Sequence, residues 1–275
     1  MKKVAYLGIA GSFSFIAAKK YFGKKINMLS NNTIKSVFMN LVNNHADYAV
    51  VPVENSTTGS ILETFDQLMK TDKTICGEIG LKIHHNLLVT AQNANISEIK
   101  TCFSHPQAIS QCESFFENHN WIKPLLATDT ATAAEMIAKN NRKDEAAIAS
   151  NETAKIYNLK ILRNSIEDSK NNFTRFVVIG SKKNNFGNKA SIVFSVKHIP
   201  GSLLQALRSY SGLGLNLTKI ESRPLFGKTW EYIFFVDFDI ENNLKNFYEM
   251  VREMKETTEF INILGIYNKG KTYET

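Results

Sequence analysis

Short apolar segments alternate with segments of helical periodicity through the first two thirds of the chain, and this rhythm constrains the fold more than any other feature. We expect strands at residues 3–7, 47–53, 75–90, 99–104, 124–127, 146–150 and 172–181, and helices at 12–22, 33–44, 60–70, 106–119 and 129–140. Alternating β and α units predict an α/β fold whose sheets are mainly parallel and are covered by helices.

The rhythm changes after residue 189. Residues 181–189 are polar, contain a glycine and show no periodicity, so we read them as a linker between domains. Beyond them, strands are expected at 190–198, 215–224, 230–240 and 260–267, and helices at 200–212 and 242–256. This is the β-α-β-β-α-β order of ferredoxin-like units. At 275 residues the chain has room for a large domain at 1–181 and a smaller one at 190–275.

Charge and cysteine content narrow the class of protein. The net charge of +7 comes from scattered lysines, whereas a nucleic-acid binder gathers basic residues into patches, so no nucleic-acid partner is expected. No segment approaches the ~20 apolar residues that span a bilayer. The three cysteines form no C-x-x-C pair, which indicates buried thiols in a reducing compartment and argues against a zinc site.

The N-terminal segment allows two interpretations. Lys2 and Lys3 before an apolar run resemble a signal peptide, but glycines and serines interrupt the run and no A-x-A site follows. We favour a first strand of the fold. The protein is therefore expected in the cytoplasm, with residues 2–18 retained.

Hydroxyl groups follow several of the expected strands, at the points where helices begin: Ser12, Ser14, Ser104 and Thr130. Helix N-termini attract anions, although serine and threonine also cap helices in any protein. Together they favour a cleft for a small anion, in either an enzyme or a binding protein. Glu54, after a buried strand, is either an acid or base of that cleft or a turn residue. His84, His85 and His105 have no partners at metal-ligand spacing, and His105 is expected to cap or orient.

Five short sequence motifs together resemble those of one protein family. VPVENSTTGSI, SHPQAISQC, DTATAA, AAIAS and NFTRF, in this order and spacing, resemble the prephenate dehydratase family. PGSLLQAL and LNLTKIESRP resemble an ACT domain of the phenylalanine-sensing kind. The resemblance covers nearly the whole chain. It departs from the family pattern at Ile9, where a proline is usual, and at Ser202, where an alanine is usual; the added hydroxyl could change effector affinity.

The resemblance implies a catalytic domain of two lobes, like a type II periplasmic binding protein, that converts prephenate to phenylpyruvate without cofactor or metal. It implies that Thr174 is the essential catalytic residue and that Asn55, Ser104 and Gln111 act as donors in the cleft. We expect Thr174 to donate to the departing hydroxyl, with Glu54 a candidate source of the proton. It implies substrate contacts for Ser12, Phe13, Thr130, Arg175 and Phe176. For Arg175 a structural ion pair is favoured, because strand neighbours point to opposite faces.

The resemblance also implies feedback regulation by phenylalanine at the ACT unit of a homodimer or homotetramer. The expected effector residues are Gly201, Ser202, Leu203, Asn216, Leu217, Glu221, Ser222 and Arg223. Two other functions stay open: an arogenate dehydratase, whose substrate has an amino group in place of the keto oxygen, and a non-catalytic amino-acid-responsive binding protein. The intact NFTRF favours the enzyme.

Overall fold

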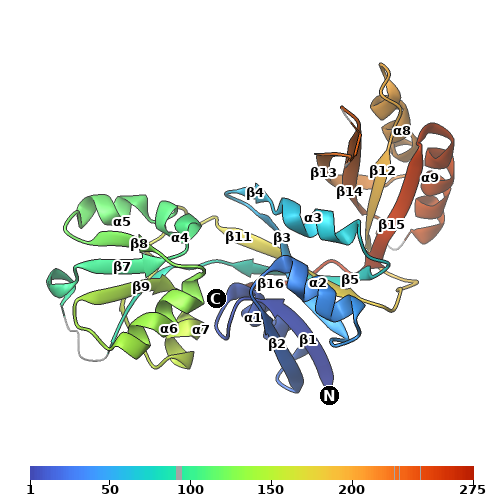
Figure 1. Cartoon of the computed structure of the whole chain (residues 1–275). Helices are drawn as coiled ribbons and strands as arrows, with labels where there is room; N and C mark the ends of the chain where they lie inside the picture. Colours follow the sequence, from blue (N-terminus) through green and yellow to red (C-terminus); the bar gives the residue numbers. More distant parts are fainter. Residues whose placement is uncertain (91–94, 226, 229, 242) are drawn as a thin grey trace. The chain divides into compact units, whose positions relative to one another are not determined.

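The computed structural model describes residues 1–90, 95–225, 227–228, 230–241 and 243–275. They form two compact units (Figure 1): unit 1 comprises Met1–Thr64, Ile79–Phe176 and Thr272–Thr275, and unit 2 comprises Phe65–Glu78 and Val177–Lys271. The boundary falls inside α3 (Leu62–Leu68), β5 (Thr74–Lys82) and β11 (Phe173–Gly180), so continuous elements belong to both units.

The first lobe of unit 1 is built on a sheet with the order β16-β5-β11-β3-β1-β2. β1 (Lys2–Leu7) is parallel to both β2 (Ile26–Asn31) and β3 (Tyr48–Asn55), and the short β4 (Gly59–Ser60) pairs with the end of β3. The centres of β1 and β3 are apolar and fully buried, as a parallel sheet covered on both faces requires. The helices of this lobe are α1 (Phe13–Phe22) and α2 (Ile34–Val42), and β16 (Thr272–Glu274) pairs with β5.

The second lobe has a sheet of five strands in the order β10-β6-β9-β7-β8. These are β6 (Asn86–Val89), β7 (Thr101–Ser104), β8 (Lys123–Leu126), β9 (Glu145–Ala149) and β10 (Lys160–Arg163).

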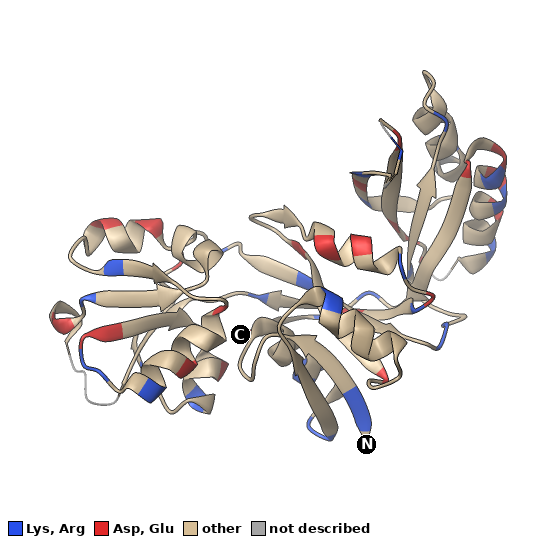
Figure 2. Cartoon of the chain, in the orientation of Figure 1, with Lys and Arg blue, Asp and Glu red and all other residues tan. Residues whose placement is uncertain are grey.

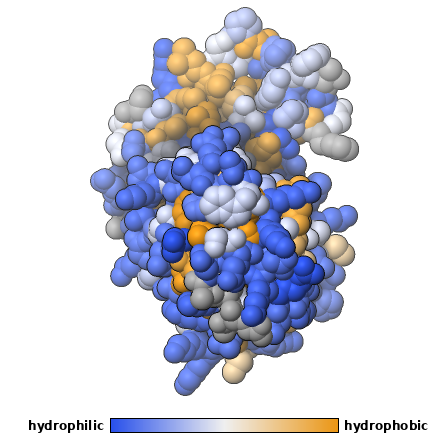
Figure 3. Space-filling model, turned by 90° about the vertical axis from the view of Figure 1, so that its left-hand side faces the viewer, coloured by the Kyte–Doolittle hydropathy of each residue, from blue (hydrophilic) through white to orange (hydrophobic). Residues whose placement is uncertain are grey.

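Two buried clusters lie against this sheet. One includes residues of α4 (Pro106–Ser110) and α5 (Glu113–Asn118), and the other residues of α6 (Thr130–Asn140) and α7 (Asn151–Ile156). The outer surface of this lobe that Figure 3 turns to the viewer is mainly hydrophilic.

Unit 2 contains the expected β-α-β-β-α-β order. Its elements are β12 (Lys189–Ser195), α8 (Ser202–Ser211), β13 (Asn216–Pro224), β14 (Tyr232–Asp239), α9 (Leu244–Thr257) and β15 (Phe260–Tyr267). The antiparallel sheet has the order β13-β14-β12-β15, and its apolar face packs under α8 and α9. The outer face of α9 alternates basic and acidic residues (Figure 2), as expected of a solvated helix.

Several expected elements differ in the structure. The strand expected at 75–90 is two strands, because residues 83–85 leave the first sheet before β6 joins the second. The helix expected at 106–119 is α4 and α5, interrupted at Gln111 and Cys112. Both sheets of unit 1 also contain antiparallel pairs, since β6 pairs antiparallel with β9 and β10, and β4 pairs antiparallel with β3. Asn242, at the start of the last expected helix, lies outside the described residues. Within the described part of the chain no helix is long and apolar enough to cross a membrane.

Candidate active site

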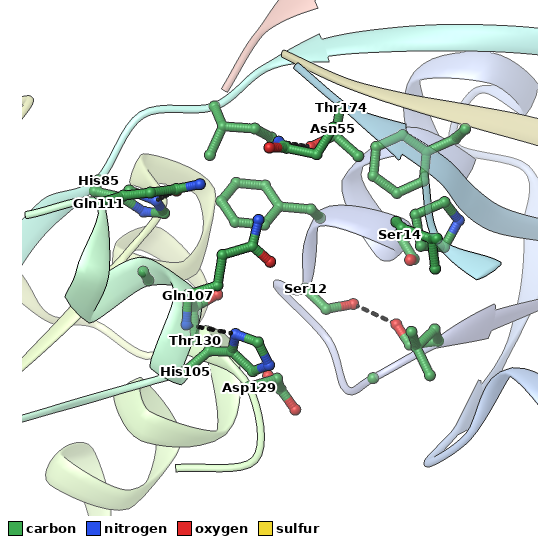
Figure 4. Close-up of a pocket in the computed structure, with 18 residues that line it drawn as sticks. Ser12, Ser14, Asn55, His85, His105, Gln107, Gln111, Asp129, Thr130 and Thr174 are labelled. Carbon is green, nitrogen blue, oxygen red and sulfur yellow. Dashed lines mark hydrogen bonds between the residues drawn. The ribbon is translucent and has the colours of Figure 1, made fainter. Parts of the chain in front are cut away.

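A cavity of about 190 Å³ lies in unit 1, where the ends of β1 and β3 and the start of β11 meet the first turns of α1, α4 and α6 (Figure 4). Polar side chains and apolar side chains share the wall. The lining residues are Leu7, Gly8, Ser12, Phe13, Ser14, Pro52, Asn55, Ile61, Ile83, His85, His105, Gln107, Ala108, Gln111, Asp129, Thr130, Thr174 and Phe176.

The turn before α1 brings a helix N-terminus to the cavity. Gly8 and Gly11 have φ values of 87° and 93°, and a Cβ on Gly8 would lie 2.8 Å from the Cβ of Ser12. Although Ile9 stands at the usual proline position, Ser12 N–H donates to Ile9 O at 3.1 Å and closes the turn. The Ser12 hydroxyl accepts from Phe15 N–H at 3.3 Å and donates to Leu7 O at 2.8 Å. The first turn of α1, with its partial positive charge, therefore lines the cavity.

Thr174 lines the cavity, and its hydroxyl oxygen already accepts one hydrogen bond from the protein. Asn55 Nδ2 donates to Thr174 Oγ1 at 2.9 Å, and across the described residues the Thr174 hydroxyl donates to no protein acceptor. Its proton is therefore free for a ligand. Phe176 lines the cavity from the same face of β11.

Gln111, at the end of α4, connects three side chains. Its Oε1 accepts from Asn172 Nδ2 at 2.8 Å and lies 2.9 Å from His85 Nε2, while its Nε2 donates to Thr57 Oγ1 at 2.7 Å. Because Gln111 presents an oxygen to His85, the His85 proton lies on Nε2. His85 is buried, and burial lowers its pKa, so the ring is neutral near pH 7.

The opposite wall contains the one acidic side chain of the lining set. Asp129 caps α6 by accepting from Ala131 N–H at 2.8 Å and Thr132 N–H at 2.9 Å, which offsets its charge. His105 caps α4 by accepting from Gln107 N–H at 3.2 Å. Burial lowers the pKa of His105, and the charge of Asp129 opposes this shift.

The described residues that line the cavity include no lysine or arginine. Nor does the described part of the chain contain a group of three or more His, Cys, Asp and Glu side chains that could hold a metal ion. A ligand in this cavity therefore meets hydroxyl, amide and imidazole groups, the carboxylate of Asp129 and the first turns of three helices.

The structure brings seven of the expected residues to the cavity and leaves three outside it. Those that line it are Ser12, Phe13, Asn55, Gln111, Thr130, Thr174 and Phe176. Arg175 points to the other face of β11, where its guanidinium lies 3.8 Å from the Glu54 carboxylate. Ser104 is buried and donates to Ile148 O at 2.8 Å.

Sequence reasoning missed several residues of the site. His85 and His105 were considered and given structural roles, and His105 combines its capping role with a place in the wall. Asn172 is the first residue of NFTRF and Thr57 lies within VPVENSTTGSI, but neither residue type by itself indicates a role. The sequence signal that could have indicated Asn172 is its position two residues before the expected catalytic Thr174.

The expected effector residues lie in unit 2. Gly201 has a φ of 84° at the start of α8, Ser202 is buried, and Leu203 packs against the core. The other five lie along β13, where Asn216 is its first residue. There Glu221 lies 3.9 Å from Lys219, and Arg223 donates two hydrogen bonds from Nη2 to the Asp66 carboxylate, at 3.0 and 2.9 Å.

Residues 4–184 match the family model described as prephenate dehydratase. The chain belongs to the prephenate dehydratase family. A prephenate dehydratase from Methanocaldococcus jannaschii is 40% identical over 277 residues, covering 97% of this chain and 98% of its own. A bifunctional chorismate mutase/prephenate dehydratase from Aquifex aeolicus is 38% identical over 275 residues, covering 99% of this chain and 75% of its own.

Solved structures share the fold over nearly the whole chain. The prephenate dehydratase from Staphylococcus aureus has a TM-score of 0.84 at 27% identity, with 97% of this chain and 100% of that chain covered. A protein described as a novel type of quorum quenching acylase, GqqA, has a TM-score of 0.87 at 26% identity, with 97% of both chains covered. At 24% identity, a prephenate dehydratase in complex with L-Phe from Arthrobacter aurescens has a TM-score of 0.87, with 97% of this chain and 90% of that chain covered.

Proposed function

We propose that this protein is a prephenate dehydratase in which Thr174 assists departure of the ring hydroxyl. In the reaction the bond from the ring to its carboxylate breaks and releases carbon dioxide. The electron pair of that bond aromatises the ring, and the carbon–oxygen bond to the hydroxyl breaks. With one proton taken up, the products are phenylpyruvate, carbon dioxide and water.

One observation supports this role above the others: the Thr174 oxygen accepts from Asn55 and keeps its proton for the cavity. Negative charge develops on the leaving oxygen in the transition state, and a positioned donor stabilises it there more than in the substrate. Glu54, expected from the sequence as a source of the proton, pairs with Arg175 and is not part of the lining set. We therefore assign the hydrogen bond to Thr174 and no proton transfer to Glu54.

The cavity wall fits the loss of a carboxylate. Both carboxylates of prephenate would be held by neutral donors and by the N-terminus of α1, because the described lining contains no cation. A carboxylate that is held by neutral donors, with no cationic partner, loses hydration on binding that these donors replace only in part. Its departure as neutral carbon dioxide relieves that cost.

Residues 190–275 are proposed as an ACT regulatory domain, after a catalytic domain at 1–181 with two lobes of the type II periplasmic-binding-protein kind. The β-α-β-β-α-β order supports the first assignment, and the return of β11 between β3 and β5 supports the second. The Arthrobacter aurescens structure was solved with L-Phe, and by analogy phenylalanine would act here as a feedback effector. A homodimer or homotetramer in the cytoplasm completes the proposal.

The test is an assay of the purified protein with prephenate and with arogenate, following phenylpyruvate and phenylalanine. Phenylpyruvate from prephenate is the expected product. Thr174→Ala should lower kcat by ~10²-fold or more with folding retained, and Thr174→Ser should keep part of the activity. A protein that turns over only arogenate would overturn the assignment of the substrate, and near-normal kcat in Thr174→Ala would overturn the mechanism.

A further inference from the structure

Four side chains beside the cavity form a closed ring of hydrogen bonds. Asn55 Nδ2 donates to Asn172 Oδ1 at 2.8 Å, and Asn172 Nδ2 donates to Gln111 Oε1 at 2.8 Å. Gln111 Nε2 donates to Thr57 Oγ1 at 2.7 Å, and Thr57 Oγ1 donates to Asn55 Oδ1 at 2.5 Å. Every member gives one hydrogen bond to the next, so the ring runs in a single direction.

Backbone groups fix that direction. Asn55 Oδ1 also accepts from the backbone N–H groups of Thr57 at 3.0 Å and Thr58 at 3.2 Å, and a backbone N–H can only donate. The oxygen of Asn55 must therefore face these groups, and its nitrogen must face Asn172 and Thr174. If the Asn172 amide were rotated by 180°, its oxygen would face the Gln111 oxygen and its nitrogen would face the Asn55 nitrogen, and both hydrogen bonds would be lost. The orientation of each amide thus follows from its neighbour.

The ring joins the two lobes of unit 1. Asn55 and Thr57 lie at the end of β3 in the first lobe, Gln111 lies at the end of α4 in the second, and Asn172 lies in the segment that leads back into β11. The ring is complete only when the lobes are close enough for Gln111 to reach Thr57. Approach of the lobes therefore closes the ring around an Asn55 amide whose oxygen already faces the backbone N–H groups of Thr57 and Thr58.

We propose that Thr57 and Asn172 are positioning residues, which act together with the backbone N–H groups of Thr57 and Thr58 to hold the Asn55 nitrogen toward Thr174 and so direct the Thr174 proton into the cavity. This inference rests on the proposed function. Neither Thr57 nor Asn172 lines the cavity, so both act through Asn55 and Gln111. Hydrogen bonds in such a chain polarise one another, and a missing member leaves a polar group of its neighbour unpaired.

Thr57→Val removes the hydroxyl at nearly constant volume. It should lower kcat about 10-fold, because one hydrogen bond of the ring that orients the Asn55 amide is lost. KM should stay within about twofold of wild type, because the substrate contacts remain. Thr57→Ser should restore kcat to within about threefold, since its hydroxyl can rejoin the ring. The matched control is Ser56→Ala. Ser56 lies in the same loop and hydrogen-bonds Asn171 O at 2.8 Å and Phe173 N at 2.9 Å, outside the ring.

Asn172→Asp gives a readout that a purely structural role would not show. The ionised carboxylate can accept from Asn55 but cannot donate to Gln111, whereas the protonated acid does both. After subtraction of the uncatalysed rate, kcat relative to wild type should rise about 10-fold as pH falls through the pKa of the new carboxyl. His85 shares the Gln111 oxygen, and burial lowers its pKa; taking kcat relative to wild type at each pH cancels the titration of His85 that the two proteins share.

Two results would overturn the proposal: equal losses of kcat in Ser56→Ala and Thr57→Val, or a kcat ratio for Asn172→Asp that does not change with pH.

A test without substrate separates the positioning role from the proposed function. No hydrogen bond joins the Thr57 side chain to the Asn172 side chain, so their effects on the urea midpoint should add unless the ring couples them. Additive shifts in the double variant Thr57→Val/Asn172→Asp would refute the ring even in an active enzyme. Non-additive shifts in a protein inactive on prephenate would support the ring and refute only the function.

Discussion

Exchanging Asn55 for aspartate should reverse the direction of the hydrogen bond between residue 55 and Thr174, while the size and shape of the side chain hardly change. The Asn55 nitrogen donates to Thr174 Oγ1 at 2.9 Å, and in Asn55→Asp a carboxylate oxygen takes its place. That oxygen can only accept, so the Thr174 proton would turn away from the cavity toward it. The leaving oxygen would then lose its donor in the transition state.

Losing one preorganised donor of this kind typically costs ~10²–10³-fold in kcat, or ~2.7–4 kcal/mol of activation free energy. We expect Asn55→Asp to fall in this range at pH 7.5, measured by the absorbance of phenylpyruvate. Thr174→Ala should lose a similar factor, and the double variant should be about as slow as either single one, because both remove the same hydrogen bond.

A suitable control is Asn40→Asp. Asn40 makes a comparable amide bond to Asn31 at 2.6 Å in the same lobe, and neither residue lines the cavity. It should change kcat by less than about twofold. A kcat of Asn55→Asp within about fivefold of wild type, or losses that multiply in the double variant with Thr174→Ala, would refute the assigned direction of the bond.

Three further predictions concern other parts of the chain. Burial lowers the pKa of His84, but hydrogen bonds to Glu167 and Glu274 outweigh it and raise that pKa. The stability that protonated His84 contributes is complete below its unfolded pKa of about 6.5 and is lost as pH rises through the raised value, so the urea midpoints of wild type and His84→Gln should differ most near pH 6 and converge near pH 9. Gly201→Ala should weaken phenylalanine binding about 10-fold by calorimetry, because its φ of 84° costs a side-chain-bearing residue ~1–2 kcal/mol; an unchanged affinity would place the effector elsewhere. Gly8→Ala should lower both kcat and the melting temperature, since its Cβ would lie 2.8 Å from that of Ser12, and normal values for both would contradict the geometry of the turn.

Local pattern predicted the α/β character, because the buried strands β1, β3 and β9 are short apolar runs bounded by polar residues. β2 was missed because Ile26–Asn31 is half polar, and it forms a strand through its pairing with β1. α4 and α5 were merged because their apolar spacing is continuous. The break at Gln111 shows only in three dimensions, where its side chain meets His85, Thr57 and Asn172.

The sequence predicted those residues of the candidate site whose side chains carry the expected donor groups, such as the hydroxyls of Ser12 and Thr174. Arg175 could be placed because strand alternation alone sends it away from the Thr174 face. The supporting residues were not predictable. Asn172 and Thr57 are separated by more than a hundred positions in the chain, and only the pairing of their amide and hydroxyl with Gln111 gives them a role.

The chain passes between its two units at residues 64/65, 78/79, 176/177 and 271/272, and this has a consequence for synthesis on the ribosome. Residues 65–78 emerge about a hundred residues before the rest of the unit to which they belong, and β16 emerges after all of unit 2. The side of β5 that β16 occupies therefore stays uncovered until residues 272–274 have been made. A nascent chain should complete its first lobe only after all of unit 2 has been made. A chaperone that binds before then would meet a first lobe that still lacks β16, with one edge of β5 exposed.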